Sequence, residues 1–195
     1  MNSEIISLLA LLNRNQKVIF AALTCEKMYP LYEKFSSLSR WGDPRIYSEG
    51  IVALYDFVLG NPDTSYQSLI DEAESIMPDL DNFTGTAPSY ALDACTALAE
   101  AISFLSDYDD SHIANCSTAA TDTVDMYVQV VHDLDPNRPD LDIVINSDVV
   151  MVNELQRQLR LAVKLKTISQ FNEESISQLR SLNGKEDIID LMSIY

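Results

Sequence analysis

The segment from Tyr90 to Ser106 constrains the fold most strongly, because a helix here is apolar around almost its whole circumference. Between its ends, the polar side chains recur at intervals of three, four and three residues, which places them in one narrow stripe. They are Asp93, Thr96, Glu100 and Ser103. Such a helix is stable in water only when its neighbours cover most of its surface. The sequence therefore predicts a bundle around a central helix over 90–106.

The rest of the 195-residue chain also favours helices. It has only five glycines and seven prolines, and valine, isoleucine and threonine rarely alternate with polar residues as a strand requires. Its 47% hydrophobic and 22% charged residues can bury enough apolar surface to offset chain entropy. We expect one all-α domain over residues 1–195, a helical bundle of roughly seven to nine helices.

Capping residues and prolines place the other helices. Asp43 followed by Pro44 is a strong helix start, and Asn183-Gly184 is a natural helix end. Pro30 lies inside a helix pattern and predicts a kink or break near Tyr29. Besides the central helix, we expect helices over 3–12, 15–37, 44–60, 64–77, 111–132 and 147–169, a loop over 80–89, and two short helices after residue 169.

The three cysteines and the start of the chain indicate a reducing compartment. Cys25, Cys95 and Cys116 are odd in number, lack CxxC spacing and lie among apolar or small residues, so we expect buried, inert thiols. The first residues lack the charge pattern of a signal peptide, and no apolar run approaches the length of a membrane span. We expect a cytoplasmic protein that does not cross a membrane.

Charge is divided sharply along the chain. From Ile46 to Asn137 there is no lysine or arginine, while these 92 residues hold 17 aspartates and glutamates. The remaining residues carry as many bases as acids, so the whole net charge of −17 belongs to this base-free segment. Such a distribution selects basic partners and repels nucleic acid, whose phosphates need clustered Lys and Arg.

The base-free segment predicts an acidic interaction face. We expect its exposed acids to include four residues on the helices over 64–77 and 111–132, namely Asp71, Glu72, Asp122 and Asp125. The helix over 147–169 carries four bases, Arg157, Arg160, Lys164 and Lys166. These bases are expected to face the protein's own acidic segment or that of a second copy, which predicts a homodimer. The acidic face predicts a basic protein partner. We expect neither nucleic acid nor a membrane as a partner.

Motifs for histidine-based catalysis and for metal or phosphate binding are missing from the sequence. His112 and His132 are the only histidines, and we expect His112 to be solvated in the first turn of its helix. Asp133, Asp135 and Asn137 start like a calcium loop, but the pattern then fails because the glycine position holds arginine. No glycine-rich phosphate loop occurs. The sequence favours a non-catalytic protein and predicts no cofactor.

Three carboxylates support an alternative. Glu26, Asp93 and Glu100 each lie on a strongly apolar helix, where an unpaired buried charge is costly. If the helices over 15–37 and 90–106 pack together, these groups converge into a site for a divalent metal or a small molecule, or for acid–base chemistry. In the simpler interpretation, Asp93 and Glu100 face water, and Glu26 pairs with a base of the helix over 147–169.

Several short stretches resemble one bacterial family. They are Ala22–Tyr32 (ALTCEKMYPLY), Gly42-Asp43, Ile76–Pro78, Asp81–Phe83 and Tyr90–Cys95. Together they resemble the YjaG-like proteins, a family classed as a domain of unknown function, nearly from end to end. In the first stretch, Lys27 and Leu31 depart from the family pattern, and Lys27 keeps the charge of an arginine without its bidentate fork. The resemblance implies an all-helical domain in the bacterial cytoplasm and supplies no catalytic residues.

Three functional hypotheses follow from the sequence. The first is a non-catalytic interaction module whose acidic face, within residues 46–137, meets a basic partner. The second is a metal-binding or ligand-binding protein, or an enzyme, that uses Glu26, Asp93 and Glu100. In the third, the acidity maintains solubility and has no dedicated partner.

Overall fold

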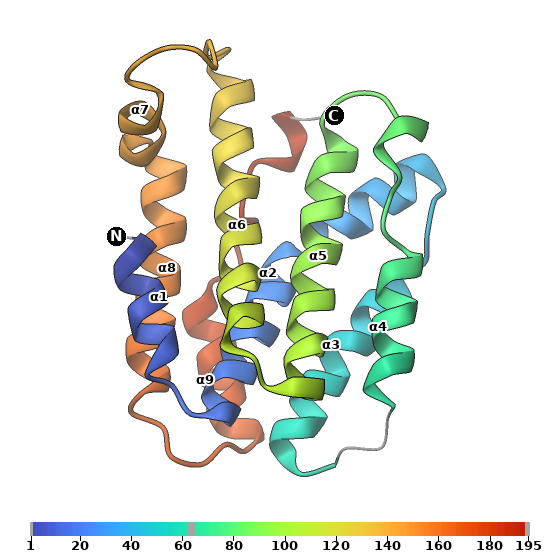
Figure 1. The fold of residues 1–195 in the computed structure, drawn as a ribbon, viewed down its shortest axis with the longest axis vertical. Helices are drawn as coiled ribbons and strands as arrows, with labels where there is room; N and C mark the ends of the chain where they lie inside the picture. Colours follow the sequence, from blue (N-terminus) through green and yellow to red (C-terminus); the bar gives the residue numbers. More distant parts are fainter. Residues whose placement is uncertain (1, 62–64, 194–195) are drawn as a thin grey trace.

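The computed structural model describes residues 2–61 and 65–193, and these residues form helices without any strand (Figure 1). The α-helices are α1 (Asn2–Ala10), α2 (Arg14–Ser39), α3 (Pro44–Leu59), α4 (Tyr66–Ser75), α5 (Ala87–Asp107), α6 (Asp110–Val131), α7 (Leu141–Ser147), α8 (Val149–Leu165) and α9 (Glu173–Asn183). Two short 3-10 helices, η1 (Leu80–Asn82) and η2 (Leu191–Ser193), complete the described structure. The predicted all-α bundle is confirmed.

The predicted central helix is α5. It packs against α2, α3, α4 and α6, and its inner faces carry fully buried alanines. Ala91, Ala94, Ala97 and Ala101 have no exposed surface, so the backbones of neighbouring helices can approach closely. Because α2 and α6 also contact each other, the three longest helices form the centre of the core. Each of the other described α-helices contacts at least one of these three.

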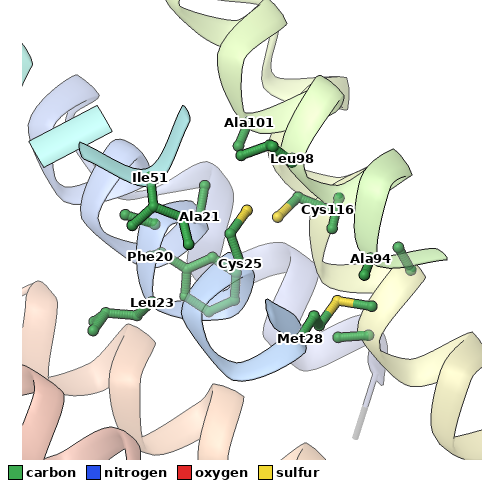
Figure 2. Packing of buried hydrophobic residues seen from close by; sticks show 14 of the residues in the cluster. Phe20, Ala21, Leu23, Cys25, Met28, Ile51, Ala94, Leu98, Ala101 and Cys116 are labelled. Atoms are coloured by element: carbon green, nitrogen blue, oxygen red, sulfur yellow. The ribbon is translucent and has the colours of Figure 1, made fainter. Parts of the chain in front are cut away.

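Sulfur atoms lie at the middle of this core. Cys25 of α2 and Cys116 of α6 face each other beside Leu98 of α5 (Figure 2). All three cysteines are buried and free, which confirms the prediction of buried thiols. Burial is the main cause that raises the pKa of the Cys25 thiol, and its contact with Cys116 raises it further. The thiolate, which is the reactive form, is therefore strongly disfavoured.

Helix boundaries follow the capping chemistry in most places. Asp43 caps α3 ahead of Pro44, Asp109 caps α6, and α9 ends before Gly184, whose φ is +80°. Of the kink or break predicted near Tyr29, the break is wrong, because α2 continues through Pro30 to Ser39, and the kink stays a prediction. Burial of the α2 side chains on both sides of Pro30 outweighs the lost backbone hydrogen bond.

The start of the helix expected over 147–169 also differs from the prediction. The expected helix over 147–169 is α8, which begins at Val149 and ends at Leu165, and α7 precedes it. Asp148 separates the two helices, and its side chain accepts a hydrogen bond of 2.8 Å from the Val150 amide.

The loop predicted over 80–89 contains η1 and the first turn of α5, which begins at Ala87. Among the described residues, no helix has the length and apolarity that a membrane span needs.

Tyr47 joins α3 to the core. Its side chain is fully buried, and its hydroxyl lies 3.2 Å from the Cys25 carbonyl oxygen and 3.1 Å from that of Ala94. The ring also stacks on Tyr32, with 5.5 Å between ring centroids. One hydroxyl therefore connects α3 to both α2 and α5.

Tyr47→Phe is expected to lower the free energy of unfolding by about 1 kcal/mol, because it removes a buried hydrogen bond while keeping the ring. Tyr29→Phe is the matched control, since the Tyr29 hydroxyl bonds Glu33 at the surface, and it should change stability by less than about 0.5 kcal/mol. Urea denaturation measures both. Equal effects of the two variants would contradict a bridging role for Tyr47.

Candidate functional site

Glu26 forms an ion pair with a residue of α9. Its Oε1 accepts a hydrogen bond from Arg180 Nε at 2.7 Å and lies 2.6 Å from Arg180 Nη2 in the same ion pair. The Arg180 guanidinium lies over the Tyr55 ring, 4.5 Å from its centroid. The sequence suggested a base from the helix over 147–169, whereas the partner comes from α9. Glu26 is thus half of an ion pair that joins α2 to α9.

Glu100 belongs to a cluster at the turn between α5 and α6. His112 Nδ1 lies 2.6 Å from Glu100 Oε2, its Nε2 lies 3.2 Å from Asp107 Oδ2, and Asn115 donates to Glu100 Oε1 at 3.2 Å. The expected solvated histidine is therefore wrong, since the His112 side chain is only 22% exposed. Desolvation lowers its pKa, but the hydrogen bonds to the two carboxylates outweigh it and raise the pKa overall.

Asp93 of α5 is bound to α6, and within the described part of the chain it forms no ion pair with a lysine or arginine. The Thr123 hydroxyl donates to Asp93 Oδ2 at 3.0 Å. Desolvation raises the pKa of Asp93 to about 6, the Thr123 bond opposes this shift, and the charge of Asp122 adds to it. The Asp93 carboxyl therefore keeps its proton to a higher pH in the folded state than in the unfolded chain.

The three carboxylates have separate partners. Glu26 binds a residue of α9, Asp93 a residue in the middle of α6, and Glu100 residues in the first turns of α6. Across residues 2–61 and 65–193, no three Cys, His, Asp or Glu side chains gather where they could hold a metal ion. Each predicted carboxylate thus contacts its own partner side chain in the folded protein. The metal hypothesis stays a prediction.

Asp93→Asn is expected to stabilise the protein by about 1–3 kcal/mol at pH 8, because the amide keeps an acceptor for Thr123 without a buried charge. A folded pKa raised above the unfolded value means that the wild type loses stability as the pH rises from about 4 to about 6. The advantage of the variant should therefore grow across this interval and stay constant above it. Urea denaturation at pH 4.5 and 8 measures it, and a pH-independent difference would contradict the assignment.

The predicted acidic face lies on two helices that flank α5. Asp71 and Glu72 belong to α4, and Asp122 and Asp125 belong to α6, with α5 between the two helices (Figure 1). Asp71 and Asp122 are exposed and the other two are half-buried. Burial raises the pKa of Asp122, and the neighbouring charge of Asp125 raises it further. Like charges on α6 are thus crowded together.

The four bases expected on the helix over 147–169 have different surroundings. Arg157 is buried and pairs with Glu154 of the same helix. Arg160, Lys164 and Lys166 are exposed, and no described ion pair joins them to residues 46–137. Only one ion pair within the described residues brings a lysine or arginine to that segment, the contact of Lys17 with Asp110.

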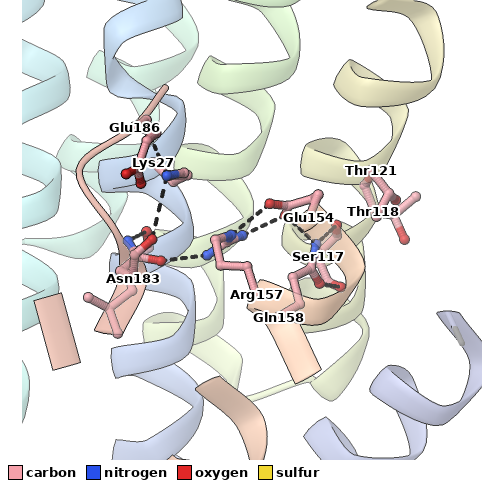
Figure 3. A network of polar contacts seen from close by, with 10 residues as sticks. Lys27, Ser117, Thr118, Thr121, Glu154, Arg157, Gln158, Asn183 and Glu186 are labelled. Carbon is pink, nitrogen blue, oxygen red and sulfur yellow. Dashed lines mark hydrogen bonds and ion pairs between the residues drawn. The ribbon is translucent and has the colours of Figure 1, made fainter. Parts of the chain in front are cut away.

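A buried polar network, which the sequence did not reveal, connects four helices (Figure 3). Arg157 donates to both Glu154 oxygens, at 2.7 and 2.6 Å, and to Asn183 Oδ1 at 2.7 Å. Asn183 Nδ2 donates to the Leu23 carbonyl oxygen at 2.8 Å, which reaches α2. Gln158 Nε2 donates to Glu154 Oε1 at 2.8 Å and to the Ser117 carbonyl oxygen of α6 at 3.1 Å.

Burial makes this network sensitive to single substitutions. Glu154 and Arg157 are each 4% exposed and Gln158 is fully buried. Their spacing of three and four residues puts them on the face of α8 that also carries Met151, Leu155 and Leu161. The sequence did carry a sign of burial, because these polar residues recur at the same helical spacing as the apolar residues of α8. The partner of Arg157, Asn183, lies 26 residues away and could not be identified from such a pattern.

A cleft opens beside the network, between α2, α8 and the segment that follows α9. One pocket of about 350 Å³ is lined by Lys27, Arg157 and Arg160, among others, and an adjoining pocket of about 330 Å³ is lined by Lys27 and Arg180. Lys27 Nζ donates to the carbonyl oxygens of Asn183, at 3.5 Å, and Glu186. Lys27 therefore lies where the two pockets meet.

Arg157→Met is expected to cost about 3–5 kcal/mol of stability, because it leaves the Glu154 carboxylate buried without its partner. The double variant Glu154→Met/Arg157→Met removes both charges and should recover more than half of that loss. A double-mutant cycle by urea denaturation measures the coupling. A double variant as unstable as the sum of the two single variants would contradict a paired, desolvated interaction.

The fold and the network define an all-helical protein in which a buried polar network joins α8 and α9 to α2 and α6. Residues 4–190 match a family described as "Protein of unknown function (DUF416)", and the chain belongs to this family. The resemblance to YjaG-like proteins is confirmed by the relatives.

Bacterial relatives of this chain carry the name "Uncharacterized protein YjaG". The protein from Escherichia coli (strain K12) is 31% identical over 113 residues, which are 57% of this chain and 58% of the relative. The protein from Salmonella typhimurium is 30% identical over the same shares. The matched region thus spans less than two thirds of each relative's length.

A solved structure has the same fold. It is the crystal structure of a DUF416 family protein from Shewanella baltica OS155, with a TM-score of 0.83 and 23% sequence identity. The comparison covers 91% of this chain and 92% of the other. The helical arrangement is therefore that of the family.

Proposed function

We propose that the protein is a non-catalytic interaction module that binds a basic protein partner through the acidic surface of α4 and α6. One observation carries the proposal: among the described residues, the acids of residues 46–137 have few basic partners, namely Lys17 for Asp110 and His112 for Glu100 and Asp107. Of the described acids in that segment, Asp110 alone forms an ion pair with a lysine or arginine. The other described pairs of Arg or Lys with acids lie outside the segment.

The arrangement of helices supports a partner of opposite charge. Residues 46–137 include nearly all of α3 and the whole of α4, α5 and α6, which are consecutive in space as well as in sequence (Figure 1). Neutralisation by a partner would relieve the repulsion that helps to raise the pKa of Asp122. Charge of one sign over such a surface steers a partner of the opposite sign and fixes its orientation.

The test compares charge at two locations. The surface variant changes Asp71, Asp122 and Asp125 to Asn and Glu72 to Gln. The control variant also removes four acids but outside the segment, with Asp142→Asn and with Gln at Glu4, Glu173 and Glu174, all of them exposed. Both variants have the same net charge, so only the position of the acids differs.

Each protein is immobilised and used to capture partners from bacterial lysate at low salt, and any retained protein is purified and titrated directly. We expect one stoichiometric basic protein on the wild type and the control and its loss from the surface variant. Binding should weaken steeply between about 50 and about 300 mM salt, because exposed charges are screened. Retention by all three proteins alike, or by none, would contradict the proposal and favour acidity that serves only solubility.

A further inference from the structure

The cleft at Lys27 has a chemical character opposite to that of the acidic surface. In a chain of net charge −17, the two adjoining pockets are lined by five bases, Lys27, Arg157, Arg160, Arg180 and Lys185. Four acids line them as well, and two of these, Glu154 and Glu26, are already bound to Arg157 and Arg180. The other two, Glu186 and Asp187, are exposed.

The hydrogen-bond acceptors at the floor of the cleft are already in use. Both Glu154 oxygens accept from Arg157, Asn183 Oδ1 accepts from Arg157, and the Asn183 carbonyl oxygen accepts from Lys27. The Glu186 carbonyl oxygen also accepts from Lys27. Apart from the exposed carboxylates of Glu186 and Asp187, which also line the pockets, a new ligand therefore meets few free acceptors there.

Donors, by contrast, remain. A guanidinium has five N–H groups and an ammonium three, while the structure gives Arg157 three acceptors and Lys27 two. Each of the three Arg157 nitrogens already donates one hydrogen bond, and this side chain, which is 4% exposed, lines the first pocket. Buried donors of this kind are normally satisfied, and an acceptor-rich group in the pocket would satisfy them.

The two cations also repel each other. Desolvation is the main cause that lowers the pKa of Lys27, and the charge of Arg157 lowers it further, although Glu154, Glu186 and Asp187 oppose the shift. An anion bound between the two cations would replace this repulsion by attraction to both. Arg160, which is exposed on α8 and lines the same pocket, adds a third cation at the opening.

We infer that the cleft between α2, α8 and the segment after α9 binds a small organic anion, whose phosphate or carboxylate group lies between Lys27, Arg157 and Arg160. Pockets of about 350 and 330 Å³ that share Lys27 fit a ligand of metabolite size, with the charged group in one and the remainder in the other. This binding site is independent of the acidic surface on α4 and α6.

Calorimetric titration with inorganic phosphate and, separately, succinate tests the inference, with sodium chloride added to hold ionic strength constant. The variants are Lys27→Met and Arg160→Gln, and Lys164→Gln is the control because it removes an exposed base one turn further along α8, outside the pockets. We expect saturable binding of one anion per chain to the wild type and the control. Binding should be at least about tenfold weaker in the two cleft variants.

The two probes distinguish the ligand classes: saturation by phosphate alone indicates a phosphate monoester, and saturation by succinate alone indicates a carboxylate. Lys27 also holds the segment after α9, so circular dichroism checks that Lys27→Met is folded, and Arg160→Gln decides alone if it is not. Absence of saturable binding of either probe to the wild type would overturn the inference. Unchanged affinity in Arg160→Gln would overturn it as well.

Discussion

The burial of α5 on nearly all sides is the constraint on which the rest of the structure depends. Its fully buried alanines let α2 and α6 pack against it and against each other, and Cys25, Leu98 and Cys116 meet at their junction. With the centre filled in this way, the outward faces of the helices can differ in chemistry. Residues 46–137 carry the acidic surface, while α2, α8 and α9 surround the donor-rich cleft.

The buried polar network joins the last helices to the rest of the bundle. Asn183, at the end of α9, accepts from Arg157 and donates to the Leu23 carbonyl oxygen, so the last helix is joined to α8 and α2 together. A buried ion pair contributes less stability than its geometry suggests, because both charges lose their hydration. Here the ion pair holds Arg157 in place, and Arg157 forms part of the wall of the cleft in which Lys27 lies.

Sequence patterns predicted the helices well and the side-chain partners poorly, for physical reasons. Periodicity and caps such as Asp43 and Asp109 act over a few residues, so they identified the central helix and most boundaries. Pro30 does not break α2, because tertiary burial outweighs a local hydrogen bond. The pairing of Glu26 with Arg180 spans 154 residues, and only the packed bundle determines it. Likewise, His112 gained its carboxylate partners from the packing of α5 against α6.

The central claim is that one small bundle presents two separate surfaces of opposite chemistry. Titration of the isotope-labelled protein with tetralysine and with inorganic phosphate, followed by amide chemical shifts, tests it most directly. The account predicts that tetralysine perturbs amides of α4 and α6, whereas phosphate perturbs amides near Lys27, Arg160 and Gly184. If the two probes perturbed the same residues, or if neither produced a localised set, the claim of two distinct surfaces would be contradicted.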